Sequence, residues 1–210
     1  MNLPNALTSM RIVLAPVTAF LLLQPSADSR LLAMAVFLVA ALSDLADGAI
    51  ARRRGEITDF GKLWDPIADK LLLVATLIPF YLITQSAPEF ARIPLFGNIG
   101  LWVLVIFFGR EILVTWLRTR AARRGTVVAA RRSGKYKAFA QNVFIGSMIL
   151  WLAYRTAVAS GAGTAPLGRG WDAFHGWFTS TSLVVAILLT VFSLFVYLRA
   201  FGSASREYGG

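Results

Sequence analysis

The sequence contains no cysteine and only one histidine, His175. The lack of cysteine excludes disulfides and thiolate zinc sites, and one imidazole cannot build a histidine metal centre by itself. Charged residues are also scarce: they make up 15% of the chain, whereas a soluble domain carries about 25%. Any bound metal must therefore be held by oxygen ligands, which favours Mg²⁺, Mn²⁺ or Ca²⁺.

What the chain has in excess is apolar sequence, since 57% of its 210 residues are hydrophobic. A soluble domain has about 45–50%, so this content predicts a bilayer as the solvent. A membrane-spanning helix needs roughly 20 mostly apolar residues, and six segments have this character. We expect an all-α integral membrane protein that forms one membrane domain over residues 1–210. The expected spans lie near residues 5–24, 31–51, 60–84, 98–118, 138–158 and 179–199.

The connections between these spans differ in charge, within a formal net charge of +10. By the positive-inside rule, the basic connections and both termini are expected in the cytoplasm. In an apolar chain such loops are expected to face anionic lipid and not nucleic acid. The basic connections hold Arg52, Arg53, Arg54 and Lys62, and Arg118, Arg120, Arg123, Arg124, Arg131, Arg132, Lys135 and Lys137; the others hold Arg30, Arg92, Arg155 and Arg169. Residues 161–176, which include His175, are expected to form a connection far from any site.

Four of the eleven acidic residues fall in a block made of two short stretches, residues 44–52 and 61–70. Asp44 and Asp47 are three residues apart and Asp65 and Asp69 are four apart, so each pair shares a helix face. Carboxylates at membrane depth cost about 2.5–3.5 kcal/mol each, and four together repel one another. Divalent cations between two antiparallel helices would offset that cost, because hard cations prefer oxygen ligands. Two such ions are a known device for in-line displacement at phosphorus.

Small and basic residues accompany the carboxylates in this block. Gly48 and Ala51 follow on the face of Asp44 and Asp47, which allows a ligand to approach the backbone, and Arg52 is placed to meet a phosphate. The block resembles the signature of the CDP-alcohol phosphotransferase family, D-x-x-D-G-x-x-A-R followed after eight residues by G-x-x-x-D-x-x-x-D. Every fixed position matches, namely Asp44, Asp47, Gly48, Ala51, Arg52, Gly61, Asp65 and Asp69.

The resemblance implies an activity and a role for each matching residue. Members of this family transfer a phosphoryl-alcohol group from a CDP-linked donor to an acceptor hydroxyl and release CMP. Asp69 would take the proton of the acceptor, and the membrane protein would be a homodimer. The ligands of two divalent ions, Mg²⁺ or Mn²⁺, would be Asp44, Asp47, Asp65 and Asp69. The nucleotide and donor contacts would be Asn5, Gly48, Ala51, Arg52, Thr58 and Gly61.

Three further stretches resemble bacterial phosphatidylglycerophosphate synthases within this family. They are the opening residues 2–11, the triplet at 109–111 and the segment 134–141, which has Ala138 where threonine is common. This subfamily uses CDP-diacylglycerol as donor and sn-glycerol 3-phosphate as acceptor. The resemblance implies a site at the cytoplasmic side of the bacterial cytoplasmic membrane, with the acyl chains of the donor in the bilayer.

An anionic acceptor requires cations, and Arg110 lies inside an expected span, where an unpaired arginine is costly. Glu111 is adjacent and points about 100° away around a helix, so we do not expect it to be the partner of Arg110. The candidate ligands of the acceptor phosphate are Arg110, Arg118, Lys135 and Lys137. For the three residues in the loops, contact with anionic lipid is an equally good interpretation.

Two alternatives remain open at this stage. An enzyme of the same family with another acceptor, such as a cardiolipin synthase using phosphatidylglycerol, would need no pocket for a soluble phosphate. A cation transporter or a non-catalytic metal-binding membrane protein would explain the acids and the spans. It would not explain the glycines, Ala51 and Arg52 at the spacing of the signature.

Overall fold

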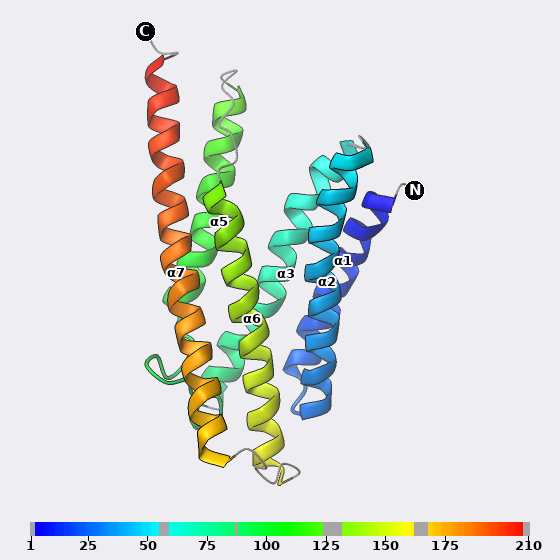
Figure 1. Ribbon diagram of the computed structural model, residues 1–210, viewed down its shortest axis with the longest axis vertical. Coiled ribbons are helices and arrows are strands. Elements are labelled where there is room, and N and C mark those ends of the chain that lie inside the picture. Colours follow the sequence, from blue (N-terminus) through cyan, green and yellow to red (C-terminus); the bar gives the residue numbers. More distant parts are fainter. Residues whose placement is uncertain (1–2, 55–58, 87, 124–131, 162–167, 208–210) are drawn as a thin grey trace. The chain divides into compact units, whose positions relative to one another are not determined.

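The computed structural model describes residues 3–54, 59–86, 88–123, 132–161 and 168–207, and within them it contains helices and turns but no strand. The side chains of residues 3–4, 44–54, 59–63, 65, 88, 90, 123, 132, 168–169 and 203–207 are not part of that description. Among these described residues, six helices are long and one is short (Figure 1). They are α1 (Leu3–Leu23), α2 (Ala27–Arg54), α3 (Asp59–Ser86), α4 (Pro88–Ala91), α5 (Leu101–Arg123), α6 (Arg132–Ala159) and α7 (Gly168–Glu207).

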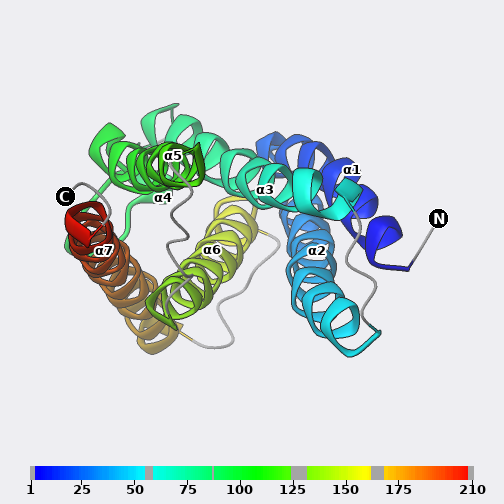
Figure 2. The same cartoon turned by 90° about the horizontal axis from the view of Figure 1, so that it is seen from above.

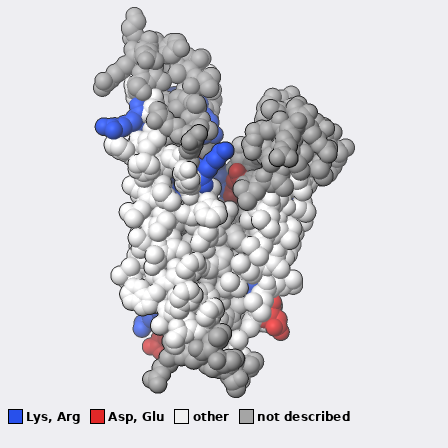
Figure 3. All heavy atoms as spheres, in the orientation of Figure 1, with Lys and Arg blue, Asp and Glu red and all other residues white. Residues whose placement is uncertain are grey.

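Each of the six expected spans overlaps one of the long helices, which confirms the all-α prediction. Among the described residues, four stretches are long and apolar enough to cross a bilayer: Asn5–Leu23, Pro66–Ser86, Ser133–Ala159 and Gly170–Gly202. On the face drawn in Figure 3, charged side chains lie toward the ends of the helices and the surface between them is uncharged. The chain is thus a multi-pass membrane protein, whereas six spans and two cytoplasmic termini stay predictions.

One expected connection is wrong: residues 168–176 belong to α7. The glycines there suggested a break, but Gly176 is small because it packs closely. A Cβ at Gly176 would lie 2.9 Å from Cδ of Pro94 and 3.3 Å from Cη2 of Trp151. His175 is accordingly buried, with Nε2 3.2 Å from the carbonyl oxygen of Ser147.

The described helices form two compact units, one comprising Met1–Ile99 and Ile145–Thr179, the other Gly100–Phe144 and Ser180–Gly210. In the first unit α1 packs along both α2 and α3, as two views show (Figures 1 and 2). Fully buried alanines, Ala15 in α1 and Ala33 in α2, allow this close approach. Each unit includes part of α6 and part of α7. The single membrane domain stays a prediction.

The second unit packs α5 against parts of α6 and α7. Phe107 and Phe144 meet edge to face, with ring centroids 6.4 Å apart. Val114 and Leu117 of α5 form a buried cluster with Tyr197 of α7. This cluster holds Tyr197 near Arg110 and Arg118 of α5, which line a pocket described in the next section.

The close packing at Gly176 predicts a change in stability. Gly176→Ala should lower the midpoint of thermal unfolding in detergent, because the added methyl group meets the rigid ring of Pro94. Overpacking of this kind costs about 1–3 kcal/mol. Gly170→Ala is the control, since nothing lies within 4 Å of its added Cβ and alanine favours a helix by up to about 1 kcal/mol. Equal midpoints for the two variants would contradict the packing.

Candidate active site

The carboxylate block lies in two helices, as the sequence predicts. Asp44 and Asp47 lie in the C-terminal half of α2, and Asp65 and Asp69 in the N-terminal half of α3. Each pair shares a face of its helix, because three or four residues nearly complete a turn of about 3.6 residues. Of the four carboxylates, the structure describes only the side chain of Asp69.

The remaining residues of the signature fall outside the described side chains. Their roles as metal and donor ligands therefore stay predictions. They are Asp44, Asp47, Gly48, Ala51, Arg52, Gly61 and Asp65, together with Thr58, whose backbone is also outside the description. Asn5 lies in α1 and is half-buried.

Asp69 forms an ion pair that the sequence did not predict. Nη1 of Arg11 donates a hydrogen bond to Oδ1 of Asp69 at 2.6 Å, and so joins α1 to α3. The side chain of Arg11 is 1% exposed, whereas that of Asp69 is 56% exposed. A charge-assisted hydrogen bond from a buried guanidinium fixes the position of the carboxylate while leaving it accessible. The available signal was an arginine inside the apolar sequence of α1, which at membrane depth requires a partner.

The groups in this region that could ligate a metal suit a hard divalent cation. The chain has no cysteine, and its one histidine is buried against Ser147, so carboxylate oxygens are the ligands available. No group of three acidic or histidine side chains occurs among the residues described. Three of the four signature carboxylates lie outside that set.

The acceptor candidates Arg110 and Arg118 line a small pocket in the second unit. Its volume is about 50 Å³, close to that of one small group such as a phosphate. Sequence reasoning missed Ser193 and Tyr197, because they lie about eighty residues further along the chain and carry no motif. The lining residues are Arg110, Arg118, Ser133, Gly134, Ser193, Val196 and Tyr197.

Two buried polar atoms of this pocket have no hydrogen-bond partner among the described residues. They are Nε of Arg110 and the hydroxyl of Tyr197. The other nitrogens of Arg110 are occupied, since Nη2 donates to Ser193 Oγ at 2.7 Å and Nη1 to Glu111 at 3.0 Å. A buried donor left unpaired costs about 1–3 kcal/mol, which an anion would offset.

Glu111 contacts Arg110 after all, so that expectation is wrong. Its Oε1 lies 3.0 Å from Nη1 of Arg110 and 2.5 Å from Nζ of Lys137. The two side chains on α5 are long enough to reach around the helix, and Lys137 attracts the carboxylate from α6. Glu111 thereby links two of the four acceptor candidates.

Lys135 and Lys137 differ in their surroundings. Lys137 is buried and bonded to Glu111, whereas Lys135 is exposed on α6. Neither belongs to the described lining of the pocket. The structure thus brings Arg110, Arg118 and, through Glu111, Lys137 together, and it gives Lys135 no place in the group.

Comparison with known proteins agrees with these features. The sequence model of the CDP-alcohol phosphatidyltransferase family matches residues 1–192. A probable phosphatidylglycerophosphate synthase of Mycobacterium tuberculosis (strain CDC 1551 / Oshkosh) is 37% identical over 162 residues, covering 76% of this chain and 71% of that protein. A CDP-diacylglycerol–glycerol-3-phosphate 3-phosphatidyltransferase of Bacillus subtilis (strain 168) is 36% identical over 161 residues, covering 71% and 77%. One of that name from Pseudomonas fluorescens is 31% identical over 201 residues, covering 95% and 90%.

The family model and these relatives identify the chain as a membrane transferase. The chain belongs to the CDP-alcohol phosphatidyltransferase family, and it is an enzyme of phospholipid synthesis.

The ion pair to Asp69 predicts that Arg11 is a positioning residue. Arg11→Met keeps much of the volume but removes the charge-assisted hydrogen bond, which contributes about 1.5–3 kcal/mol. We expect kcat for CMP release to fall about ten- to a hundredfold, with the KM of the donor changing less.

Arg11→Lys is the matched variant, because it keeps the charge and loses the planar fork, and it should recover part of kcat. Thermal unfolding of both variants serves as the folding control. A folded Arg11→Met protein with the kcat of the wild type would exclude the positioning role.

Proposed function

We propose that the protein transfers the phosphatidyl group of CDP-diacylglycerol to sn-glycerol 3-phosphate, giving phosphatidylglycerophosphate and CMP. The observation that carries the choice of acceptor is the basic pocket of the second unit. It combines Arg110, Arg118 and Tyr197, and Nε of Arg110 and the hydroxyl of Tyr197 lack a partner among the described residues. The printed names of the relatives from Bacillus subtilis and Pseudomonas fluorescens give the same donor and acceptor.

The transfer needs little covalent help from the protein. A hydroxyl oxygen of the acceptor forms a bond to the phosphorus that carries diacylglycerol, and the bond from that phosphorus to the CMP oxygen breaks. In this proposal Asp69 takes the proton of the hydroxyl, and Arg11 holds the carboxylate in place at 2.6 Å. Positioning and charge neutralisation supply most of the rate enhancement in such displacements.

The four signature carboxylates would hold Mg²⁺ or Mn²⁺ in this proposal. Bound there, the ions would neutralise the pyrophosphate of the donor. Asp44, Asp47, Asp65 and Asp69 are carboxylates on two consecutive helices, which suits an oxygen-only site. Asn5, Gly48, Ala51, Arg52, Thr58 and Gly61 would contact the nucleotide of the donor.

The membrane location follows from the substrates in this proposal. The acyl chains of the donor stay in the bilayer, and the soluble acceptor arrives from the cytoplasm. The signature end of α2 and α3 would then face the cytoplasm, together with both termini, in the cytoplasmic membrane of a bacterium. The family resemblance adds a homodimer to this proposal.

An assay of CMP release tests the proposed reaction. Purified protein with CDP-diacylglycerol and Mg²⁺ should release CMP with sn-glycerol 3-phosphate and not with glycerol or phosphatidylglycerol. EDTA should stop the release and added Mg²⁺ or Mn²⁺ should restore it, whereas Asp69→Asn should be inactive. CMP release only with phosphatidylglycerol would instead identify a lipid acceptor. Metal flux in vesicles without CMP release would contradict the proposal altogether.

The unpaired hydroxyl predicts a specific kinetic effect at Tyr197. Tyr197→Phe keeps the ring that packs on Val114 and Leu117 and removes only the hydroxyl. A neutral hydrogen bond contributes about 1 kcal/mol, so we expect the KM of the acceptor to rise about three- to tenfold. The KM of the donor should not change.

Tyr136→Phe is the control, because Tyr136 is in the same unit and is 61% exposed. Arg110→Gln should raise the acceptor KM further than Tyr197→Phe. An unchanged acceptor KM in both Arg110→Gln and Tyr197→Phe would remove this pocket from the acceptor site.

A further inference from the structure

The connection between α3 and α5 contains a tight turn with an unusual backbone. Leu95 lies at its tip with a φ angle of 71°, in the left-handed region that a bulky side chain rarely adopts. The amide of Phe96 donates to the carbonyl oxygen of Pro94 at 2.8 Å. This bond makes Leu95 the centre of a γ-turn of the positive-φ type, which is rare and strained. Glycine or asparagine would adopt the same conformation more easily, so the leucine side chain requires an explanation.

The turn pairs most of its backbone donors internally. The amides of Ile93 and Gly97 each donate to the carbonyl oxygen of the other at 2.9 Å, and Pro94 has no amide hydrogen. With the bond from Phe96, three of the four backbone N–H groups in residues 93–97 are thus paired within the turn. In a loop that faces water the solvent pairs such groups, whereas inside a bilayer the protein has to pair them. The turn therefore has the internal pairing that an apolar environment demands.

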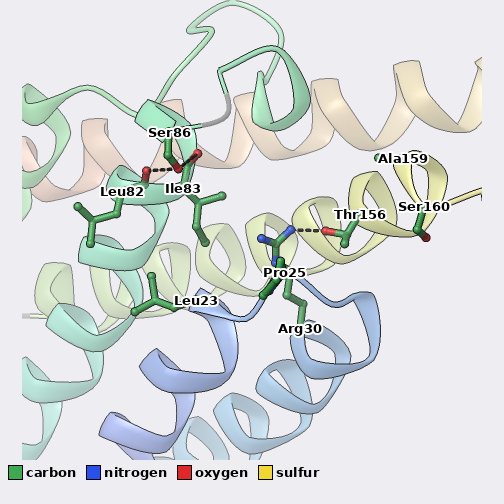
Figure 4. Close-up of a pocket in the computed structure, with 9 residues that line it drawn as sticks. All are labelled: Leu23, Pro25, Arg30, Leu82, Ile83, Ser86, Thr156, Ala159 and Ser160. Atoms are coloured by element: carbon green, nitrogen blue, oxygen red, sulfur yellow. Dashed lines mark hydrogen bonds between the residues drawn. The ribbon is translucent and has the colours of Figure 1, made fainter.

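The connection also begins and ends beside the apolar helix α3. Ser86 is the last residue of α3, and its hydroxyl donates to carbonyl oxygens of the preceding turn (Figure 4). The chain returns to this helix at Ile99, whose amide donates to the hydroxyl of Thr84 at 3.2 Å. Both residues of α3 lie within the stretch that is long and apolar enough to cross a bilayer. The turn is thus the middle of a short excursion from the end of a membrane span.

Side chains of α6 and α7 hold the turn in place. Pro94 packs on Gly176 of α7, where an added Cβ would lie 2.9 Å from its Cδ. The indole Nε1 of Trp151 in α6 donates to the carbonyl oxygen of Arg92 at 3.2 Å. All these residues belong to the first unit. The position of the turn along α6 and α7 is therefore defined by Trp151 and Gly176.

That position lies inward of an ion pair at this end of α6 and α7. Arg155 and Asp172 form the pair, with Nη1 and Oδ1 3.9 Å apart and both side chains partly exposed. The two residues that hold the turn each lie four positions further into these helices, which is about 6 Å along a helix axis. Inward of the pair, residues 138–154 and 173–198 contain no Lys, Arg, Asp or Glu. The turn therefore lies level with the apolar part of both helices.

The tip of the turn exposes an apolar side chain at this level. Leu95 is 70% exposed. On α7, Phe174 and Phe178 lie one on each side of Gly176 in the sequence and are 62% and 46% exposed, with ring centroids 6.3 Å apart. An apolar surface at the level of an uncharged membrane span faces lipid. Leu95 thus continues the surface by which the helices contact the bilayer.

We propose that residues 93–97 form a turn inserted among the acyl chains of the bilayer, with Leu95 as the side chain in contact with them. Transfer of this leucine from water to hydrocarbon is favourable and offsets the strain of its backbone. The turn follows the C-terminal end of α3, whereas Asp65 and Asp69 lie in the N-terminal half of that helix. It would therefore anchor the connection between α3 and α5 in the membrane without taking part in the reaction.

Single cysteines can test the environment of the turn, because the chain has no cysteine of its own. Leu95→Cys in the full chain is labelled with a nitroxide and reconstituted in vesicles of phosphatidylglycerol and phosphatidylcholine. Electron paramagnetic resonance then measures collisions of the label with oxygen, which concentrates in hydrocarbon, and with a water-soluble nickel chelate. Ser160→Cys is the water-exposed control, since Ser160 is exposed at the end of α6 (Figure 4). Phe20→Cys is the lipid-exposed control, since Phe20 is 63% exposed in the span of α1.

We expect the ratio of oxygen to nickel collisions at position 95 to match that of Phe20→Cys and to exceed that of Ser160→Cys severalfold. A ratio equal to that of Ser160→Cys would place the turn in water and overturn the proposal. Low accessibility to both reagents would overturn it as well. With spin–spin broadening, that result indicates that a second copy of the chain covers the turn, and without broadening it indicates packing within one chain. The unfolding midpoint of each labelled protein is the folding control, and at the exposed position 95 the label should leave it unchanged.

Discussion

A charged side chain inside an apolar helix bundle needs an opposite charge or a set of dipoles, because transfer to membrane depth is costly. The described structure meets this need in three places. Arg11 has the carboxylate of Asp69, Arg110 and Lys137 share Glu111, and Arg30 has carbonyl oxygens and a hydroxyl. In the first two places the partners also hold residues that the proposed reaction uses. The same contacts thus stabilise the charges in the bilayer and hold the side chains of the candidate sites in place.

The sequence was sufficient to predict the helices and the helical placement of the carboxylates. Apolar runs near 20 residues and the spacings within the pairs depend on local geometry alone, which a sequence displays directly. The start of α7 was not predicted, because a glycine in the sequence can indicate either a break in a helix or a close packing contact. At Gly176 the contact is with Pro94, about eighty residues earlier, and only the folded chain brings the two together.

The partners of the charges were harder to predict, for the same reason. Arg11 and Asp69 are 58 residues apart and Arg110 and Ser193 are 83 apart, and no local period connects such positions. Tyr197 has no motif around it and acquires its interest from a buried hydroxyl beside two arginines. Glu111 was judged from the helical angle between neighbours, which describes Cβ directions and not the reach of long side chains. The acidic pairs, by contrast, could be predicted from the sequence, because carboxylates within apolar segments are unfavourable in a membrane and therefore indicate a functional site.

The bridge formed by Glu111 also has a consequence for charge matching. Arg110, Arg118 and Lys137 carry three positive charges and Glu111 one negative charge, so the four side chains have a formal sum of +2. A phosphate monoester carries about −1.5 to −2 at pH 7 and would nearly neutralise them, whereas a phosphodiester carries only one negative charge. In the proposed acceptor site, this formal charge of the four side chains would suit a doubly charged anion better than a singly charged one. A soluble monoester would be selected over the singly charged head groups that surround the protein in its membrane.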